Sequence, residues 1–413
     1  MRHANTMDTC HGVCNSHDYL NVPIGDFRIT ERERWYLEVA LASGQVSYGP
    51  LSEEFETRVA NIHGARYGLF MNSGTSALHI ALAALKQLDG WKDGDEVIVP
   101  ATTFVATANV ILHNNLTPVF VDVDNESFNI RPDLIENYIT PRTRCIMPVH
   151  LLGLPANMEQ VVKIAGRHGL RIIEDSCESM FAEQNGRMVG SMGDIGCFST
   201  YVAHYIVTGV GGVAVTSDPT VGATMRSLMN HGRNGIYISH RDGLSASGSR
   251  AEEVISKRFQ FESLGHSFRS TDLQAALGLG QLDICQDIYA ARLANAHEYA
   301  MGLNALKDRI VTQTAGYEAS NAYMVFGFRV RDGHKHGLVR FLEARGIETR
   351  DLLPLVNQPV YDRLGFRFSR DEYPNAWELI SDGMYLGAHQ FLSSDQISWV
   401  IDSIVRYFEM EGC

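Results

Sequence analysis

The feature that most constrains the fold is a series of short apolar runs that alternate with helical patterns. The runs cover residues 96–100, 118–123, 145–149 and 170–173. Helical patterns lie between them, at 103–112 and 158–168. Runs buried on both faces and alternating with helices are typical of an α/β fold built on a largely parallel sheet. Ligands of such sheets bind at the carboxyl ends of the strands.

Length and charge narrow the class of protein. A chain of 413 residues is too long for one typical core and predicts two domains. Its 35 basic and 48 acidic side chains give a net charge of −13, which argues against nucleic acid or an anionic membrane as the main partner. The chain has neither a run of about 18 apolar residues nor the apolar core of a signal peptide. We therefore expect a cytoplasmic protein.

The seven cysteines are scattered and odd in number, which fits reduced thiols better than a disulfide framework. Cys10 and Cys14, with His11 and His17 nearby, could form a metal site. They lack a second matching pair, so we expect no metal there.

The pattern divides the chain into three parts. Residues 1–24 read as a leader whose order, if any, comes from a partner subunit. A large α/β domain covers 25–285, and a smaller α+β domain covers 286–413. A capping box, Thr30 with Glu33, predicts a helix near the start of the large domain. Ser393 with Gln396 predicts the last helix, at 394–408.

Several strand and helix ends carry polar or aromatic residues. Gly74, Thr75 and Ser76 open a helix, where free backbone N–H groups can bind a phosphate, although most such turns are only caps. Phe104 follows the first strand and is either a core residue or a ring that stacks on a ligand. Asp175 ends another strand, where an acid can also be a helix cap.

Residues 196–216 hold the motif on which the functional interpretation depends. A strand ends near Phe198, a polar turn begins at Ser199 and leads to His204, and a glycine-rich hinge, 209–212, leads into another strand. This pattern resembles the active-site loop of the DegT/DnrJ/EryC1/StrS sugar aminotransferase family. There a lysine holds pyridoxal phosphate as a Schiff base, at the position of His204. The nearest lysines in sequence, Lys163 and Lys257, are not neighbours of the motif.

The resemblance, which covers about residues 25–410, implies a fold-type I pyridoxal-phosphate enzyme and roles for individual residues. Asp175 would pair with the pyridine nitrogen, and Phe104 would stack on the ring. Glu178 stands where aminotransferases of the family show Gln or His and its 3-dehydratases show Asp. The segments 231–234 and 265–269 also resemble segments of the family. The residues that the resemblance implies as cofactor contacts are Gly74, Thr75, Ser76, Phe104, Asp175, Glu178, Ser199, Asn234 and Ser267. Ser267 replaces the family's asparagine.

His204 decides between the activities of the family. Lysine anchors the cofactor and also moves a proton, whereas imidazole can do only the second. The family's nucleotide-sugar 3-dehydratases carry histidine here and use pyridoxamine phosphate. The resemblance therefore implies a noncovalent cofactor, an amino donor such as glutamate, and dehydration of a nucleotide-linked 4-keto sugar at carbon 3. His204 would be the base, while Asp175 keeps the ring protonated.

Two alternatives stay open. One is an aminotransferase in which His204 moves the proton, and the other is a non-catalytic sugar-nucleotide-binding or scaffold protein. Family members are dimers with shared sites, so the loop 234–258 is expected to serve the neighbouring subunit. One branch of the dehydratases carries an iron–sulfur cluster on cysteines after the loop. Residues 202–284 contain no cysteine, so we expect none here.

Overall fold

The computed structural model describes residues 20–233, 252–253, 256–257, 259–352 and 355–412. Cys10, Cys14 and Asn234 therefore lie outside the described residues, as does most of the loop 234–258. None of the helices in these ranges combines the length and apolar character that a membrane crossing needs.

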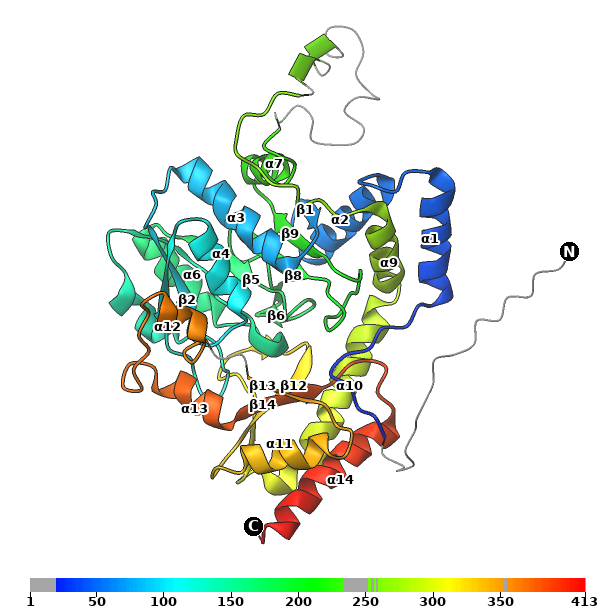
Figure 1. Ribbon diagram of the computed structural model, residues 1–413, viewed down its shortest axis with the longest axis vertical. Coiled ribbons are helices and arrows are strands. Elements are labelled where there is room, and N and C mark those ends of the chain that lie inside the picture. The colour runs from blue at the N-terminus through cyan, green and yellow to red at the C-terminus, as the bar shows by residue number, and fades with distance from the viewer. Residues whose placement is uncertain (1–19, 234–251, 254–255, 258, 353–354, 413) are drawn as a thin grey trace, which may run out of the picture.

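The elements follow one another as an α/β half and then an α+β half (Figure 1). The helices are α1 (Glu31–Ser43), α2 (Pro50–Ile62), α3 (Gly74–Asp89), α4 (Val105–His113), α5 (Pro132–Ile135), α6 (Met158–His168), α7 (Pro219–Leu228), α9 (Asp272–Leu282), α10 (Cys285–Gly302), α11 (Lys335–Glu343), α12 (Pro359–Arg363), α13 (Pro374–Asp382) and α14 (Ser394–Met410). The strands are β1 (Tyr67–Met71), β2 (Glu96–Pro100), β3 (Thr117–Val121), β4 (Thr143–Ile146), β5 (Arg171–Asp175), β6 (Glu183–Gln184), β7 (Arg187–Met188), β8 (Ile195–Ser199), β9 (Gly212–Thr216), β10 (Ile310–Thr312), β11 (Ala319–Ser320), β12 (Val325–Val330), β13 (Thr349–Asp351) and β14 (Gly383–Gly387).

The large sheet has seven strands in the order β1-β9-β8-β5-β4-β2-β3. Strands β8, β5, β4, β2 and β3 pair in parallel, and β9 pairs antiparallel with both of its neighbours. The mainly parallel sheet predicted from the alternating pattern is thus confirmed. Because β5 is the central strand of the seven, its carboxyl end opens at the centre of one sheet edge.

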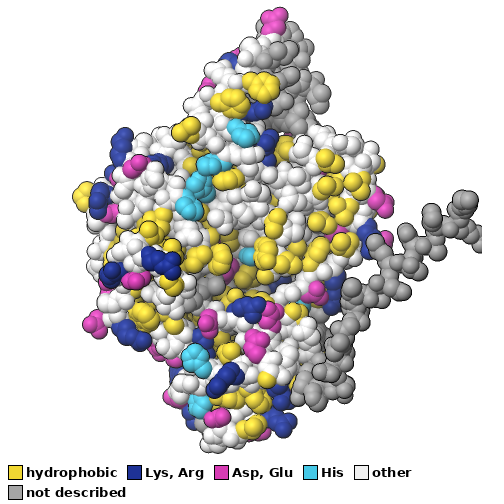
Figure 2. Space-filling model, in the orientation of Figure 1, with side chains coloured by type: hydrophobic (Ala, Val, Ile, Leu, Met, Phe, Trp, Pro, Cys, Tyr) yellow, Lys and Arg dark blue, Asp and Glu magenta, His cyan; other side chains and the backbone are white. Residues whose placement is uncertain are grey.

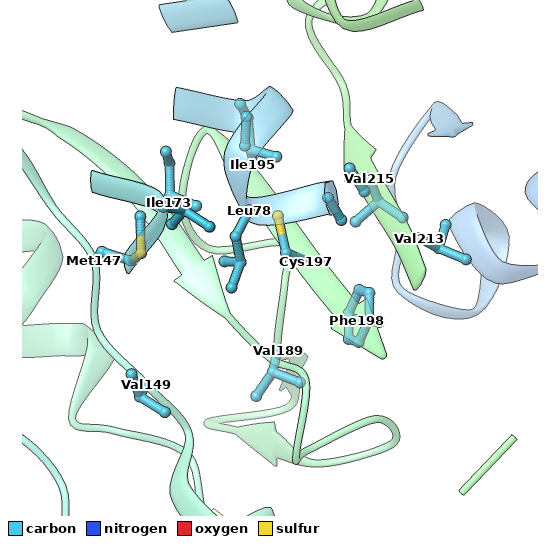
Figure 3. Packing of buried hydrophobic residues seen from close by; sticks show 14 of the residues in the cluster. Leu78, Met147, Val149, Ile173, Val189, Ile195, Cys197, Phe198, Val213 and Val215 are labelled. Atoms are coloured by element: carbon cyan, nitrogen blue, oxygen red, sulfur yellow. The ribbon is translucent and has the colours of Figure 1, made fainter. Parts of the chain in front are cut away.

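Helices cover both faces of this sheet. On one face Leu78 of α3 packs over Ile173 of β5 and Cys197 of β8 (Figure 3). On the other face Ile172 joins a cluster with Val161 of α6. Successive residues of a strand point to opposite faces, so Ile172 and Ile173 belong to different layers.

The smaller sheet is antiparallel, in the order β10-β12-β14-β13, and lies below the large sheet in Figure 1. Its core is shared with α10, α11 and α14. The capping box of Ser393 with Gln396 is present at the start of α14, and that of Thr30 with Glu33 is present at α1. Helix α10 begins at Cys285, the predicted domain boundary, and the boundary itself stays a prediction.

Several expected element bounds differ from the structure. Helix α4 begins at Val105, two residues later than expected, and β5 runs to Asp175, two residues further than expected. Strands β3 and β4 begin one and two residues earlier than expected, at Thr117 and Thr143. The end of the leader is ordered by its own chain, because Val22 is buried and its N–H donates to the Gly346 carbonyl at 2.9 Å.

Candidate active site

A cavity of about 430 Å³ opens where β2, β5 and β8 end, between the large sheet and the smaller one. It brings together seven of the residues predicted from the sequence, which come from four separate stretches of the chain. They are Gly74, Thr75, Phe104, Asp175, Glu178, Ser199 and His204.

The start of α3 forms one wall of the cavity. The Ser73 hydroxyl caps the helix by accepting from the Ser76 N–H at 3.0 Å. A Cβ on Gly74 would lie 2.9 Å from both Cys177 Sγ and Ser199 Cβ, and a Cβ on Gly212 would lie 2.4 Å from the Gly74 nitrogen. Only glycine allows this approach, which places Ser199 against a helix N-terminus whose free N–H groups suit a phosphate.

Asp175 lies deeper in the cavity and is 5% exposed. The Thr107 hydroxyl donates to Oδ2 at 2.8 Å, and the Cys177 N–H donates to Oδ1 at 3.2 Å. Burial raises the pKa of Asp175, although both of these hydrogen bonds act to lower it. A cation brought next to the carboxylate would reverse the shift, as a protonated pyridine nitrogen does.

Glu178 follows one turn later and also faces the cavity. Its Oε2 accepts from the Leu152 N–H at 2.9 Å. Burial, with the charge of Asp175 adding to it, raises the pKa of Glu178 to about 7. The carboxyl therefore exchanges a proton near neutral pH.

His204 sits in a turn whose ends are pinned together. Thr200 and Thr208 lie at its base, where the Thr208 N–H donates to the Thr200 carbonyl at 2.9 Å and the two hydroxyls are 2.6 Å apart. The Nδ1 atom of His204 is buried and makes no hydrogen bond within the described chain. Burial lowers the pKa of His204 to about 4, with the charge of Arg292 adding to the effect. The imidazole is thus neutral at pH 7, and His204 lines the cavity.

Two of the described residues predicted for the site, Ser76 and Ser267, do not line this cavity. Ser76 faces a neighbouring hollow of about 320 Å³, and its hydroxyl donates to Asn72 at 2.6 Å. Ser267 accepts from Arg269 at 3.2 Å and lies outside the cavity of its own chain. Asn234 is outside the described residues. Their contacts to a cofactor stay predictions.

Sequence reasoning missed residues that the smaller domain supplies. Met324, just before β12, and Tyr385 of β14 both line the cavity. No motif marks either residue, and only the packing of the smaller sheet against the large one brings them there. Among the described lining residues there is no lysine, and Phe104, 55% exposed, offers its ring at the cavity mouth.

A comparison with known protein families agrees with the fold. The sequence profile of the DegT/DnrJ/EryC1/StrS aminotransferase family matches residues 28–405. The chain belongs to this family. Its fold class, predicted as fold-type I, is confirmed by this membership and by the solved structures of relatives.

The family relatives include both aminotransferases and dehydratases. GDP-perosamine synthase of Caulobacter vibrioides is 32% identical over 392 residues, which are 94% of this chain and 98% of that protein. A dTDP-4-dehydro-2,6-dideoxy-D-glucose 3-dehydratase of Saccharopolyspora spinosa is 30% identical over 92% of this chain and 85% of its own length. The solved structure of E. coli GDP-4-keto-6-deoxy-D-mannose-3-dehydratase with bound hydrated PLP matches with a TM-score of 0.83 and 26% identity, covering 93% of this chain and 99% of that one.

Proposed function

We propose that this DegT/DnrJ/EryC1/StrS family member is a pyridoxal-phosphate- and pyridoxamine-phosphate-dependent 3-dehydratase of a nucleotide-linked 4-keto sugar. The observation that carries the proposal is His204, which occupies the position of the family's cofactor-binding lysine and faces a cavity with no lysine in its described lining. A site of this kind holds the cofactor without a covalent bond. Relatives in both activity classes act on nucleotide sugars, as their names state.

The residues present fit the cofactor. The N-terminus of α3 at Gly74 and Thr75, with Ser199 against it, would hold the phosphate. Asp175 would hold the protonated ring nitrogen, and Phe104 would cover one face of the ring. When bound, the cofactor supplies an amine for the sugar ketone and an aromatic ring that accepts electrons.

Three side chains handle charge and protons. His204, neutral at pH 7, accepts a proton from the substrate at an imidazole nitrogen. Asp175 keeps its negative charge oriented through Thr107 and the Cys177 N–H. Glu178, whose pKa is about 7, holds or releases a proton at Oε1 while Oε2 stays on the Leu152 N–H. Loss of a hydroxyl needs both a base and a nearby acid, and His204 and Glu178 line the same cavity.

A second copy of the chain would complete the site. The described cavity lining contains no arginine either, although a phosphate and a nucleotide diphosphate each need positive charge. Hydrophobic side chains gather in the middle of the face shown in Figure 2. The exposed apolar residues include Trp35, Leu41, Tyr201, Val210 and Leu264. A homodimer would cover such side chains and bring the basic segment around Arg233 and Arg269 to the neighbouring cavity.

The test is an incubation with pyridoxal phosphate, glutamate and a panel of nucleotide-linked 4-keto sugars, with products weighed by mass spectrometry. Loss of the carbon-3 hydroxyl without retained nitrogen is the expected result. An amine retained in the product would instead identify an aminotransferase, the activity named for the Caulobacter relative. A purified protein that takes up no cofactor would identify a non-catalytic protein.

A further inference from the structure

Arg292 of α10 has an unusual environment for an arginine. Its side chain is among the largest that are fully buried, and the residue is 2% exposed. Nη1 donates to the Met324 carbonyl at 2.7 Å, and Nη2 donates to the His204 carbonyl at 3.1 Å. Its Cζ lies 4.9 Å from the centre of the Tyr205 ring. Among the described residues it forms no ion pair with a carboxylate, and its Nε has no hydrogen-bond partner.

Arg226 of α7 shows what an arginine with a purely structural role looks like in the same protein. It also stacks on a tyrosine, Tyr48, at 5.2 Å and donates to a backbone carbonyl, that of Gly68, at 3.0 Å. Its guanidinium, however, donates a hydrogen bond of 2.6 Å to each carboxylate oxygen of Glu56. A buried charge without such a partner is costly, and burial lowers the pKa of Arg292 to about 10. Fold stability alone does not account for a cation at position 292.

The hydrogen bonds of Arg292 connect two sides of the cavity. One reaches the backbone of His204. The other reaches Met324, whose N–H donates to the Leu152 carbonyl at 3.1 Å, and the Leu152 N–H donates in turn to the Glu178 carboxylate at 2.9 Å. Tyr205, under the guanidinium, donates its hydroxyl to the Glu178 carbonyl at 3.2 Å.

We propose that Arg292 is a positioning residue that holds the backbone of His204, and through it the imidazole, in place relative to Glu178. The inference rests on the proposed function for its effect on the reaction, but its effect on His204 does not. Arginine suits the task because its rigid fork reaches two carbonyls at once, which lysine cannot do.

The charge also has a consequence for pH dependence. The cation disfavours a second positive charge on the imidazole, which is why it helps burial to lower the pKa of His204. The other titratable groups that line the cavity with His204 are Tyr201, Asp175, Cys177, Glu178 and Tyr385. The two carboxylates would favour the imidazolium, so removing Arg292 leaves burial as the remaining effect that lowers the pKa of His204.

The experiment uses the full-length holoprotein with Arg292→Met, Arg292→Lys and the matched control Arg226→Lys. The His204 imidazole is titrated by NMR in histidine-labelled protein and assigned by its absence in His204→Asn. Turnover, the Michaelis constant for the sugar and cofactor absorbance are measured over the same pH range. Neither Arg292 nor Arg226 lines the cavity, although Arg292 donates to the backbone of two residues that do, His204 and Met324.

Arg292→Met is expected to move the His204 titration to higher pH and to lower kcat by about 10-fold or more, with cofactor absorbance retained. Arg292→Lys keeps the charge and loses the fork, so kcat falls while the titration stays near that of the parent. Arg226→Lys lowers the unfolding temperature and changes neither kcat nor the His204 titration.

If Arg292→Met does not fold, Arg292→Lys decides, because a kcat equal to that of the parent overturns the proposal. An unmoved His204 titration in a folded Arg292→Met protein overturns it as well. A parent that dehydrates no sugar, combined with the expected NMR shift, removes the proposed function and leaves the effect of Arg292 on His204 standing.

Discussion

The last two residues of β5 place two carboxylates in opposite environments, although both are buried. Glu174 accepts from His150 Nε2 at 3.0 Å and from the backbone N–H groups of Gly190, Met192 and Gly193 at 2.8, 2.7 and 2.6 Å. Burial acts to raise its pKa, but these bonds hold it below its usual range. Asp175, on the other face of the strand, accepts from Thr107 and from the Cys177 N–H, and its pKa is raised.

The histidines His150 and His204 differ in the same way. His150 has both ring nitrogens in hydrogen bonds, since Nδ1 accepts from the Ala156 N–H at 2.9 Å and Nε2 meets Glu174. The Nδ1 of His204 has no such partner in the described chain. Glu174 and His150 thus form a pair with its hydrogen bonds made, and this pair stabilises the fold. Asp175 and His204 face a cavity and have hydrogen-bonding capacity left over. Hydrogen-bond completeness, more than burial, separates the structural set from the functional one.

Exchanging carboxylate for amide at the two positions gives the largest contrast. Asp175→Asn should leave the fold intact and lower turnover by about 10³-fold or more, because a neutral amide cannot hold a ring nitrogen in its protonated state. Glu174→Gln turns an NH₂ group toward backbone donors and should cost roughly 3–5 kcal/mol of unfolding free energy, with kcat per folded molecule retained. Urea unfolding and single-turnover assays measure the two effects. Unchanged turnover in Asp175→Asn would contradict its assigned role.

The histidines provide the next test. His204→Asn should preserve cofactor absorbance and lower the rate by about 10²–10⁴-fold, the usual contribution of a positioned general base. His150→Asn should instead lower the unfolding free energy, because Glu174 loses its side-chain donor. If the His204→Asn protein dehydrates the sugar as fast as the parent, His204 is a packing residue and the proton is taken up elsewhere.

A lysine at position 204 sharpens the comparison further. His204→Lys restores the amine found in the family's aminotransferases, so it should give a new absorbance band with pyridoxal phosphate and lose at least about 10²-fold of dehydration. After borohydride reduction, peptide mapping should find the cofactor attached to residue 204 in this variant and to no residue in the parent. A labelled lysine in the parent, for example Lys257, would show that the cofactor is covalently held after all.

The sequence predicted the central part of this picture because local patterns encode it. Strand ends at Pro100, at Asp175 and, within one residue, at Ser199 were readable from apolar runs followed by polar turns, and the parallel topology then placed them at one edge. The histidine in place of lysine was visible in the motif itself.

The remainder depends on contacts between distant segments. Tyr385 lies on β14, a short strand with glycine at both ends and no alternation, and Arg292 lies on a helix without a motif. Strand β1 was missed because its apolar run leads directly into the polar turn that opens α3. The sequence also does not show that Glu174 accepts more hydrogen bonds than Asp175. The number of bonds depends on which loop backbones approach β5.

The smallest expected effect concerns pH and stability, and it separates Glu178 from Glu174. The pKa of Glu178 in the fold is about 7 against an ordinary value of 4.5, so folding favours its protonated form. Its contribution to stability is fully present below pH 4.5 and is lost as the pH rises through about 7. Glu174, whose pKa is lowered, contributes in the opposite sense: its stabilisation is present at neutral pH and is lost as the pH falls.

Urea unfolding of the cofactor-free protein between about pH 4 and pH 8 measures both slopes. Glu178→Gln mimics the protonated acid, so it should match the parent near pH 4.5 and exceed its unfolding free energy at pH 8, by at most about 1.4 kcal/mol for each unit of pKa shift. Glu174→Gln should show its greatest loss at neutral pH. Parallel curves for the parent and Glu178→Gln would mean that Glu178 ionises like any surface acid. In that case it would hold no proton at pH 7, and the acid paired with His204 would have to come from another group.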